Sequence, residues 1–480
     1  MRKKIGLLAM TAICLVLVSC TQKGADDDPF GYERLRAELG DATPDGAGIA
    51  VHLVEGSVGT RFAPDVADIE FLDASIEVTP TVLEPPSSHA TAMARRLFGN
   101  ASSTSPGIVD VKAFESMTWI GSVLNMGSAR LPEPSTARIA SHSWVGNADH
   151  PELPARRSVE ILRRLDWLIE SDEFIQVVGF NGDPDSPLLS AAWNAVSVSH
   201  IDGAYATESP IVGWDDYPDG RIRPDIVVPE VNPSSATARV ASAVAVLIDG
   251  ARSASTASTS ASSTSAALPS RAGARFVNAE RGEVIKAALM AGANRATPQR
   301  GDSAGIADYR ADGQRTVNGL DTRYGAGALD VYTSFQIVTA AEHDSIEDRS
   351  GSRADFPARG FDFDPSFGGG GASNSSASYR VAAAPREREL TVALVWNARA
   401  SSGRRLRFDT PTAVSDLDLA LYELDGDGEP LDIVASRSRV DNSEHITARL
   451  VANRDYSLRV ETGSGQEPFE WDYALAWRLD

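Results

Sequence analysis

Short apolar runs alternate with helix-like stretches over the first two thirds of the chain. Residues 49–54 and 174–180 are apolar runs of strand length. Residues 162–173 predict a helix, and the small and branched apolar residues at 239–248 predict another, which Gly250 would end. Strands that alternate with helices are typical of an α/β fold with a doubly wound, mostly parallel sheet.

The pattern changes to short alternating runs after residue 378, which predicts a smaller all-β sandwich domain. Its expected strands lie at residues 390–396, 416–424, 456–461 and 471–477. Between two of them, the Asp-Gly-Asp-Gly sequence at residues 425–428 predicts a hairpin turn, with a calcium site as the alternative interpretation.

Two low-complexity stretches interrupt these patterns. Residues 253–275 begin with a run of Ser, Ala and Thr and predict a flexible insertion, while the glycines near residue 370 indicate a linker. The expected boundaries are a signal peptide at 1–20, an acidic tether at 21–46, the α/β domain at 47–345, a linker at 346–378 and the sandwich at 379–480.

Composition narrows the classes of partner and of stabilising chemistry. The chain of 480 residues is 42% hydrophobic, which is ordinary for a globular protein, and its formal net charge is -21. An acidic chain without a basic stripe argues against nucleic acid as the main partner. Cys14 and Cys20 are the only cysteines, and both lie near the start. A disulfide framework or a thiolate metal cluster in the body of the protein is therefore excluded.

The first twenty residues carry the features of an export signal. Residues 2–4 are basic, and the apolar run at 5–18 is too short for a comfortable bilayer span. The run ends in Leu-Val-Ser-Cys at 17–20, which resembles the bacterial lipobox. That resemblance implies lipidation of Cys20 and export to the outer membrane or surface of a bacterial cell. An ordinary secretory signal or an uncleaved anchor is the alternative.

Four motifs follow one another along the α/β domain. Residues 51–58 form an apolar strand that ends in a carboxylate and small residues, and a histidine opens a helix at residues 89–94. Residues 177–182 are a strand that ends in Asn-Gly, and residues 223–229, Arg-Pro-Asp-Ile-Val-Val-Pro, precede Ser-Ser-Ala-Thr-Ala at 234–238. In this order and context, the motifs resemble those of the subtilisin-like serine proteases, the subtilases, over residues 47–339.

The resemblance implies a serine endopeptidase that acts on proteins or peptides. By resemblance, Ser234 is the nucleophile, His89 the base, Glu55 the acid and Asn181 the donor to the oxyanion. Ser143, Trp144, Val145 and Gly146 look like the strand that pairs with the substrate backbone. The chemistry needs no cofactor. Relatives use calcium to stabilise loops, but this sequence does not show ligands for it.

Elementary physics agrees with this assignment. Reactive groups in doubly wound folds gather at the carboxyl ends of parallel strands, and Glu55 and Asn181 both end predicted strands. Ser234 precedes a helix, whose N-terminus favours developing negative charge. His89 begins another helix, where the dipole is expected to lower its pKa and leave a neutral imidazole to take the serine proton.

The sequence also departs from the family pattern. Glu55 stands where the family has Asp, and a register with Val54 at that position would leave no carboxylate. Asn-Pro at 232–233 replaces Gly-Thr before the serine, Ala90 replaces a glycine and Ala238 a proline. A diverged member with altered flanks around its site is expected.

These departures keep other interpretations open. Ser234 could cap its helix, Ser235 is the nearest rival as nucleophile, and His89 could be a surface histidine. The chain would then be a catalytically inactive, subtilase-like binding or assembly module on the cell surface. The sandwich is expected to have a structural or positioning role, with a carbohydrate-binding lipoprotein as a further alternative.

Overall fold

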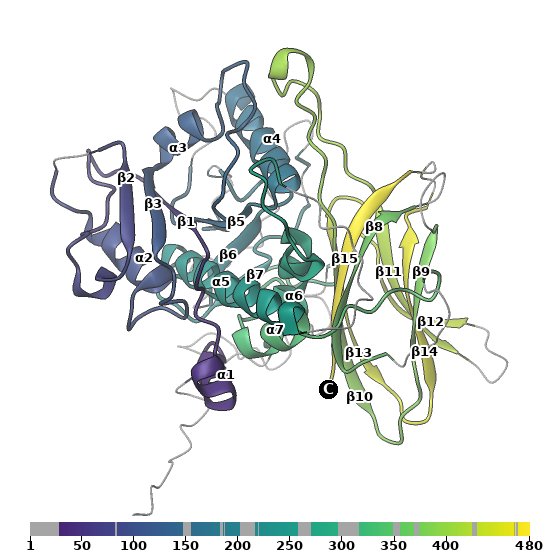
Figure 1. Ribbon diagram of the computed structural model, residues 1–480. Coiled ribbons are helices and arrows are strands. Elements are labelled where there is room, and N and C mark those ends of the chain that lie inside the picture. The colour runs from purple at the N-terminus through teal and green to yellow at the C-terminus, as the bar shows by residue number, and fades with distance from the viewer. Residues whose placement is uncertain are drawn as a thin grey trace, which may run out of the picture.

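The computed structural model consists of an α/β domain beside an all-β sandwich (Figure 1). It describes residues 28–81, 84–146, 155–182, 186, 188–201, 217–218, 220–257, 270–295, 316–348, 356–368, 374–424, 430–464, 466 and 469–480. Cys20 with the rest of the expected signal peptide, and the Asp-Gly-Asp-Gly sequence at 425–428, lie outside the described residues. No helix within the described part is long and apolar enough to cross a membrane.

The α/β domain is built on a seven-stranded sheet in the order β2-β3-β1-β4-β5-β6-β7, in which every neighbouring pair is parallel. The central strands are buried along their whole length, as their continuous apolar sequences require. The fold class predicted from the sequence is therefore confirmed. The strands are β1 (Val51–Glu55), β2 (Ser75–Thr79), β3 (Asp110–Glu115), β4 (Ile139–His142), β5 (Ile175–Gly179), β6 (Val196–His200) and β7 (Ile226–Val228).

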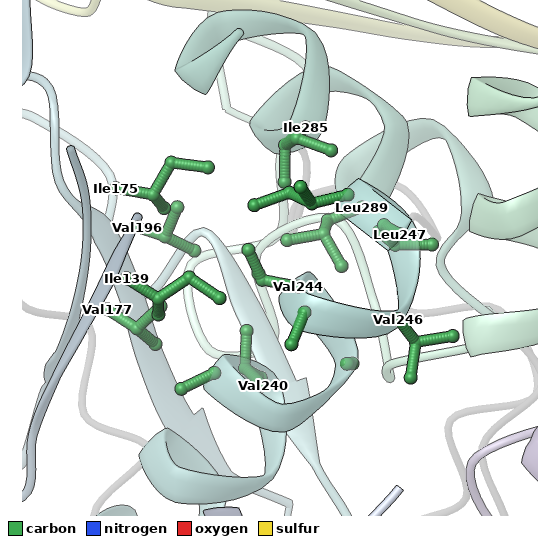
Figure 2. Packing of buried hydrophobic residues seen from close by; sticks show 14 of the residues in the cluster. Ile139, Ile175, Val177, Val196, Val240, Val244, Val246, Leu247, Ile285 and Leu289 are labelled. Atoms are coloured by element: carbon green, nitrogen blue, oxygen red, sulfur yellow. The ribbon is translucent and has the colours of Figure 1, made fainter. Parts of the chain in front are cut away.

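Helices cover both faces of this sheet. One face packs on α2 (Ser88–Phe98) and α5 (Pro233–Ala257), and the other on α3 (Ser116–Ser122) and α4 (Ala155–Asp172). Figure 2 shows the first face, where Val240 and Val244 of α5 lie against Val177 of β5 and its neighbours. Two further helices, α6 (Gly282–Gly292) and α7 (Val331–Val338), belong to the same core.

Helix α5 is longer than the sequence predicts. The expected end at Gly250 is wrong, because the helix continues to Ala257 and takes in the first residues of the expected insertion. A Cβ atom on Gly250 would lie 2.4 Å from Cε2 of Phe335 in α7. The glycine therefore allows two helices to approach closely, instead of ending one of them.

The described part of the expected tether packs against the α/β domain. Residues 32–39 form α1 (Tyr32–Leu39), whose Leu35 is buried in the core, and the backbone N–H of Val331 donates to Phe30 O at 2.7 Å. The N–H groups of Asp45 and Gly46 both donate to the Asp249 carboxylate in α5. Residues 28–46 are therefore part of the folded domain, in contrast to the predicted tether.

The sandwich consists of two four-stranded antiparallel sheets, ordered β13-β10-β15-β8 and β12-β11-β14-β9. Its first strand lies inside the expected linker, so the domain begins before residue 379. The strands are β8 (Arg359–Phe367), β9 (Ser376–Val381), β10 (Arg388–Val395), β11 (Leu417–Leu424), β12 (Pro430–Ser436), β13 (Ser443–Leu450), β14 (Asp455–Thr462) and β15 (Trp471–Leu479).

One hydrophobic cluster extends across the boundary between the two domains. Phe361, Phe363 and Val395 of the sandwich belong to the same buried cluster as Ile285 and Leu289 of α6. The sheet that contains β10 and β15 packs directly on α6. This part of the interface is therefore apolar, as in a single hydrophobic core.

Candidate active site

Polar side chains from distant parts of the sequence meet at one edge of the α/β sheet. Glu55 is the last residue of β1, and Ser143 directly follows β4, the strand beside it. Asn181 lies two residues beyond β5, which pairs with β4. Because the carboxyl ends of parallel strands lie at one edge, the topology brings these three residues together.

Glu55 and His89 form the central contact of this edge. Oε2 of Glu55 lies 2.8 Å from Nδ1 of His89. The Glu55 side chain is 1% exposed, whereas that of His89 is 46% exposed. His89 is the second residue of α2, and Ser87 caps this helix by accepting a hydrogen bond from Ala90 N. The cap and the buried carboxylate hold the imidazole with one nitrogen toward Glu55.

The pKa values of both partners are raised, each for a different reason. Burial raises the pKa of Glu55 to about 7, and the hydrogen bond from His89 acts in the opposite direction. The hydrogen bond to Glu55 raises the pKa of His89, with burial opposing it. The expected lowering of the His89 pKa is therefore wrong, because the hydrogen bond to Glu55 and its charge outweigh the effect of burial. With Nδ1–H directed at Glu55, the neutral imidazole leaves Nε2 to accept a proton.

Ser234 hydrogen-bonds to the segment after β4. Its hydroxyl donates to Ser143 O at 3.1 Å, and the Ser143 hydroxyl donates to Ser234 O at 3.3 Å. Within the described part of the chain, no hydrogen bond joins Ser234 to His89. The structure thus brings Ser234 together with Ser143, and His89 together with Glu55, as two separate pairs.

The unusual residues before Ser234 form the start of α5. Asn232 Oδ1 accepts a hydrogen bond from Ser235 N at 2.8 Å, and the helix begins at Pro233. Proline fits the first position of a helix because its missing N–H would have no helical partner there. Asn232, rather than Ser234, is therefore the capping side chain. The Ser234 hydroxyl takes no part in capping.

A glycine allows the first turn of α5 to approach β5. A Cβ atom on Gly179 would lie 3.2 Å from Thr237 Oγ1 and 3.6 Å from His142 O. This close approach sets the start of α5 beside the end of the strand that leads to Asn181. Asn181 itself is partly buried at this edge.

A buried histidine, His142, accepts a hydrogen bond from the segment that is expected to pair with the substrate. The Trp144 indole donates to His142 Nδ1 at 3.3 Å, and His142 Nε2 lies 2.8 Å from Gln176 Oε1. Burial lowers the pKa of His142 to about 4, so its ring is neutral and donates from Nε2. The sequence signal for this role of His142 is its place at the end of a buried strand, directly before Ser143.

One end of this strand is already paired. Gly146 and Leu188 exchange backbone hydrogen bonds of 2.8 and 3.2 Å in an antiparallel bridge. Val145, by contrast, is 40% exposed. The exposed part of this segment is therefore Val145, whereas Ser143 is buried. Among the described residues, no group of three or more His, Cys, Asp or Glu could hold a metal ion.

Comparisons with known proteins give low similarity. No family model matches the chain, and no curated protein matches it. A lanthipeptide protease of known structure has a TM-score of 0.38 at 13% identity, over 63% of this chain and 92% of that one. The structure of the subtilase cytotoxin SubAB has a TM-score of 0.31 at 15% identity, over 53% and 91%. A cold-adapted subtilisin-like serine proteinase has a TM-score of 0.29 at 15% identity, over 42% and 76%. Because each TM-score lies below 0.5, the proposal below depends on the site geometry.

Proposed function

We propose that this protein is a subtilisin-like serine endopeptidase. The observation that carries the proposal is the contact between the buried Glu55 carboxylate and His89 Nδ1, at the sheet edge where Ser143 meets Ser234. A carboxylate that orients an imidazole, with a serine at a helix N-terminus on the same edge of the sheet, supplies the groups that acyl transfer requires. The substrates would be proteins or peptides.

In the proposed mechanism, Ser234 Oγ attacks the peptide carbonyl and its proton passes to His89 Nε2. The Glu55 carboxylate fixes the ring and balances its positive charge. Asn181 donates to the oxyanion, a contact whose loss in another such enzyme costs about 3 kcal/mol in the barrier. His89 then gives its proton to the leaving amine as the C–N bond breaks. Water hydrolyses the acyl-enzyme by the same steps in reverse order.

The nucleophile has to change its partner before it reacts. Ser234 Oγ donates to Ser143 O, and His89 Nε2 must replace this carbonyl as the acceptor. The released Ser143 O is then available to accept a backbone N–H of an extended substrate. Substrate binding and release of the serine would therefore favour each other.

The hydrogen bond from Ser234 to Ser143 O favours a second function, an inactive binding or assembly module. In that case Ser234 would keep its bond to Ser143, and the Glu55–His89 pair would be structural. Cleavage of an unfolded protein substrate separates the two functions. The endopeptidase predicts cleavage that Ser234→Ala abolishes and that the neighbouring control Ser235→Ala retains. Folded wild-type protein that neither cleaves nor reacts with a serine-directed fluorophosphonate would support the module.

We also propose that the protein is exported and anchored through lipidated Cys20. The basic start, the short apolar run and the Leu-Val-Ser-Cys sequence at 17–20 support this proposal. Feeding cells a fatty acid with a chemical tag tests it. The tag should be incorporated into the wild type and into the control Cys14→Ser, and not into Cys20→Ser. Equal incorporation in all three proteins would contradict the anchor.

A further inference from the structure

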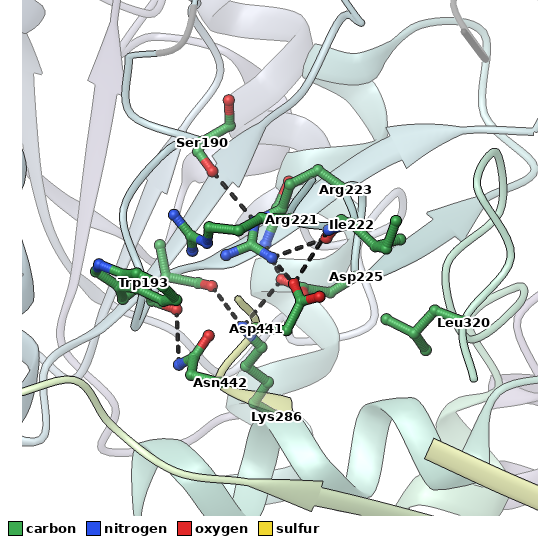
Figure 3. Close-up of polar contacts among 12 residues, drawn as sticks. Ser190, Trp193, Arg221, Ile222, Arg223, Asp225, Lys286, Leu320, Asp441 and Asn442 are labelled. Atoms are coloured by element: carbon green, nitrogen blue, oxygen red, sulfur yellow. Dashed lines mark hydrogen bonds and ion pairs between the residues drawn. The ribbon is translucent and has the colours of Figure 1, made fainter. Parts of the chain in front are cut away.

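A buried polar network joins the sandwich to the segment that leads to β7 (Figure 3). Arg221 and Arg223 of the α/β domain are 0% and 1% exposed. Arg221 donates to Ala191 O at 2.7 Å, and Arg223 donates to Ser190 O at 3.3 Å. These carbonyl groups accept hydrogen bonds but carry no net charge, so the two positive charges are left to be balanced by carboxylates.

The α/β domain alone does not balance the charge of this network. Among the described residues, three of its buried cations face two of its carboxylates, so one positive charge is left. The cations are Arg221, Arg223 and Lys286, and the carboxylates are Asp166 and Asp225. Burial lowers the pKa of Arg221 to about 9 and that of Lys286 to about 8. An unbalanced cation here would therefore weaken the domain.

Asp441 of the sandwich supplies the missing negative charge. It lies between β12 and β13, is 4% exposed, and its charge acts on both Arg221 and Arg223. Its Oδ1 accepts a hydrogen bond from Ile222 N at 3.0 Å, between the two arginines. Asp441 therefore hydrogen-bonds to the backbone of residues 221–223 and also balances positive charge on their side chains.

The segment that Asp441 holds leads directly to Ser234. Asp225 Oδ2 accepts a hydrogen bond from Ser197 N of β6 at 2.7 Å and lies 3.1 Å from Lys286 Nζ. It immediately precedes β7, and Ser234 follows the end of β7 by six residues. A shift of the segment would therefore pass along β7 to the start of α5.

We propose that Asp441 of the sandwich is a positioning residue that fixes the segment before β7 and thereby the placement of Ser234. The proposal deepens the endopeptidase function and rests on it. It gives the sandwich a defined part in catalysis that does not involve substrate. Because a displacement near 1 Å at a catalytic group can cost about a hundredfold in rate, a small movement of α5 would be measurable.

The test compares three variants of the full chain. Asp441→Ala removes the hydrogen bond and the charge, whereas Asp441→Asn keeps an acceptor for Ile222 N. Leu419→Ala is the control, because Leu419 is buried in the sandwich core and belongs to a different cluster from the α/β domain. The readouts are kcat and KM on a peptide, the rate of fluorophosphonate labelling, and hydrogen exchange over residues 220–237.

Asp441→Ala is expected to lower kcat and the labelling rate by about tenfold or more, with KM within about twofold. Asp441→Asn should regain part of this loss. Exchange over residues 220–237 should rise in Asp441→Ala and stay at the wild-type level in Leu419→Ala. Wild-type rates and exchange in a folded Asp441→Ala protein would overturn the proposal, as would equal effects in Leu419→Ala.

Failure of the endopeptidase function gives a different result. In that case the wild type would show neither cleavage nor labelling. Hydrogen exchange would then still decide whether Asp441 holds residues 220–237, because it requires no activity. Unchanged hydrogen exchange over residues 220–237 in Asp441→Ala would contradict the positioning role, whether or not the wild type is active.

Discussion

At the scale of single residues, the position of Glu55 at the end of β1 accommodates a side chain that is one methylene longer than that of Asp. Glu55 pairs in register with Glu115 of β3, so its backbone is held within the sheet, and its carboxylate still reaches His89. Its other oxygen, Oε1, is buried and has no hydrogen-bond partner in the described structure. A carboxylate that is only partly satisfied binds its proton more tightly, which is consistent with the raised pKa.

The raised pKa values predict the pH dependence of activity. In the proposed mechanism, His89 must be neutral to accept the serine proton, and its pKa is raised. Activity should therefore fall as pH decreases, with a midpoint above the value of about 6.5 for an ordinary histidine. Glu55→Gln should move this midpoint to lower pH and reduce kcat/KM by about a hundredfold or more.

A pH profile of kcat/KM measures both effects. Glu115→Gln is the matched control, because it changes a carboxylate at the end of the neighbouring strand that caps α3 and does not contact His89. It should keep the wild-type midpoint. A midpoint below 6.5 in the wild type, or the same midpoint in Glu55→Gln, would contradict the assigned pair.

At the scale of elements, Gly250 allows α5 to pack closely on α7 and does not end the helix. Gly250 lies where α5 touches Phe335 of α7, and a larger side chain would overlap the ring. Gly250→Val should lower the free energy of unfolding by about 1–3 kcal/mol through overpacking. Gly121→Val in α3, where a Cβ meets nothing within 4 Å, should lower it far less.

Denaturant unfolding measures this difference. Removing the ring in a Gly250→Val, Phe335→Ala double variant should return part of the lost stability, because the two side chains interact directly. Equal losses for Gly250→Val and Gly121→Val, or additive losses in the double variant, would show that the glycine has no packing role.

The elements also show what sequence patterns could and could not predict. Continuous apolar runs identified β1 and β5, and the motif order placed Glu55 and His89 at one edge. Gly250 predicts a helix end from its sequence, whereas its role is in packing against Phe335, which lies far along the chain. Strands β12 and β13 were missed because β12 has exposed apolar residues and β13 buries Glu444 and His445, so neither shows simple alternation.

At the scale of the whole molecule, the domain interface buries acidic groups. Glu283 of α6 is 3% exposed, and its Oε1 accepts a short hydrogen bond of 2.5 Å from Asn397 of the sandwich. Burial raises its pKa well above the usual range, and neighbouring carboxylates add to this effect. The facing groups are Glu170 and Glu173 at the end of α4, Asp472 of β15 and the opposing Arg281.

The raised pKa of Glu283 predicts how stability changes with pH. The folded state keeps this proton above the pH at which the unfolded state loses it, so the contribution of Glu283 to stability falls as pH rises above about 4.3. Glu283→Gln keeps the acceptor for Asn397 and has no proton to lose. Its free energy of unfolding should therefore gain on the wild type as pH rises, by up to about 1.4 kcal/mol per pH unit.

Unfolding at a series of pH values checks this prediction. Glu77→Gln, a substitution at a side chain that is 66% exposed, is the control and should run parallel to the wild type. A constant difference between Glu283→Gln and the wild type from pH 5 to 9 would show that Glu283 does not hold a proton in the folded protein.

The most direct measurement of the central claim is the site of attack by a fluorophosphonate, mapped by mass spectrometry on the folded full-length protein. In the proposed mechanism, Glu55 and His89 activate Ser234, whose hydroxyl donates to Ser143 O at the same edge of the sheet. The account predicts one adduct, on Ser234, formed at a rate that falls in Glu55→Gln. An adduct on Ser235 or another residue, or no adduct on folded protein, would contradict it.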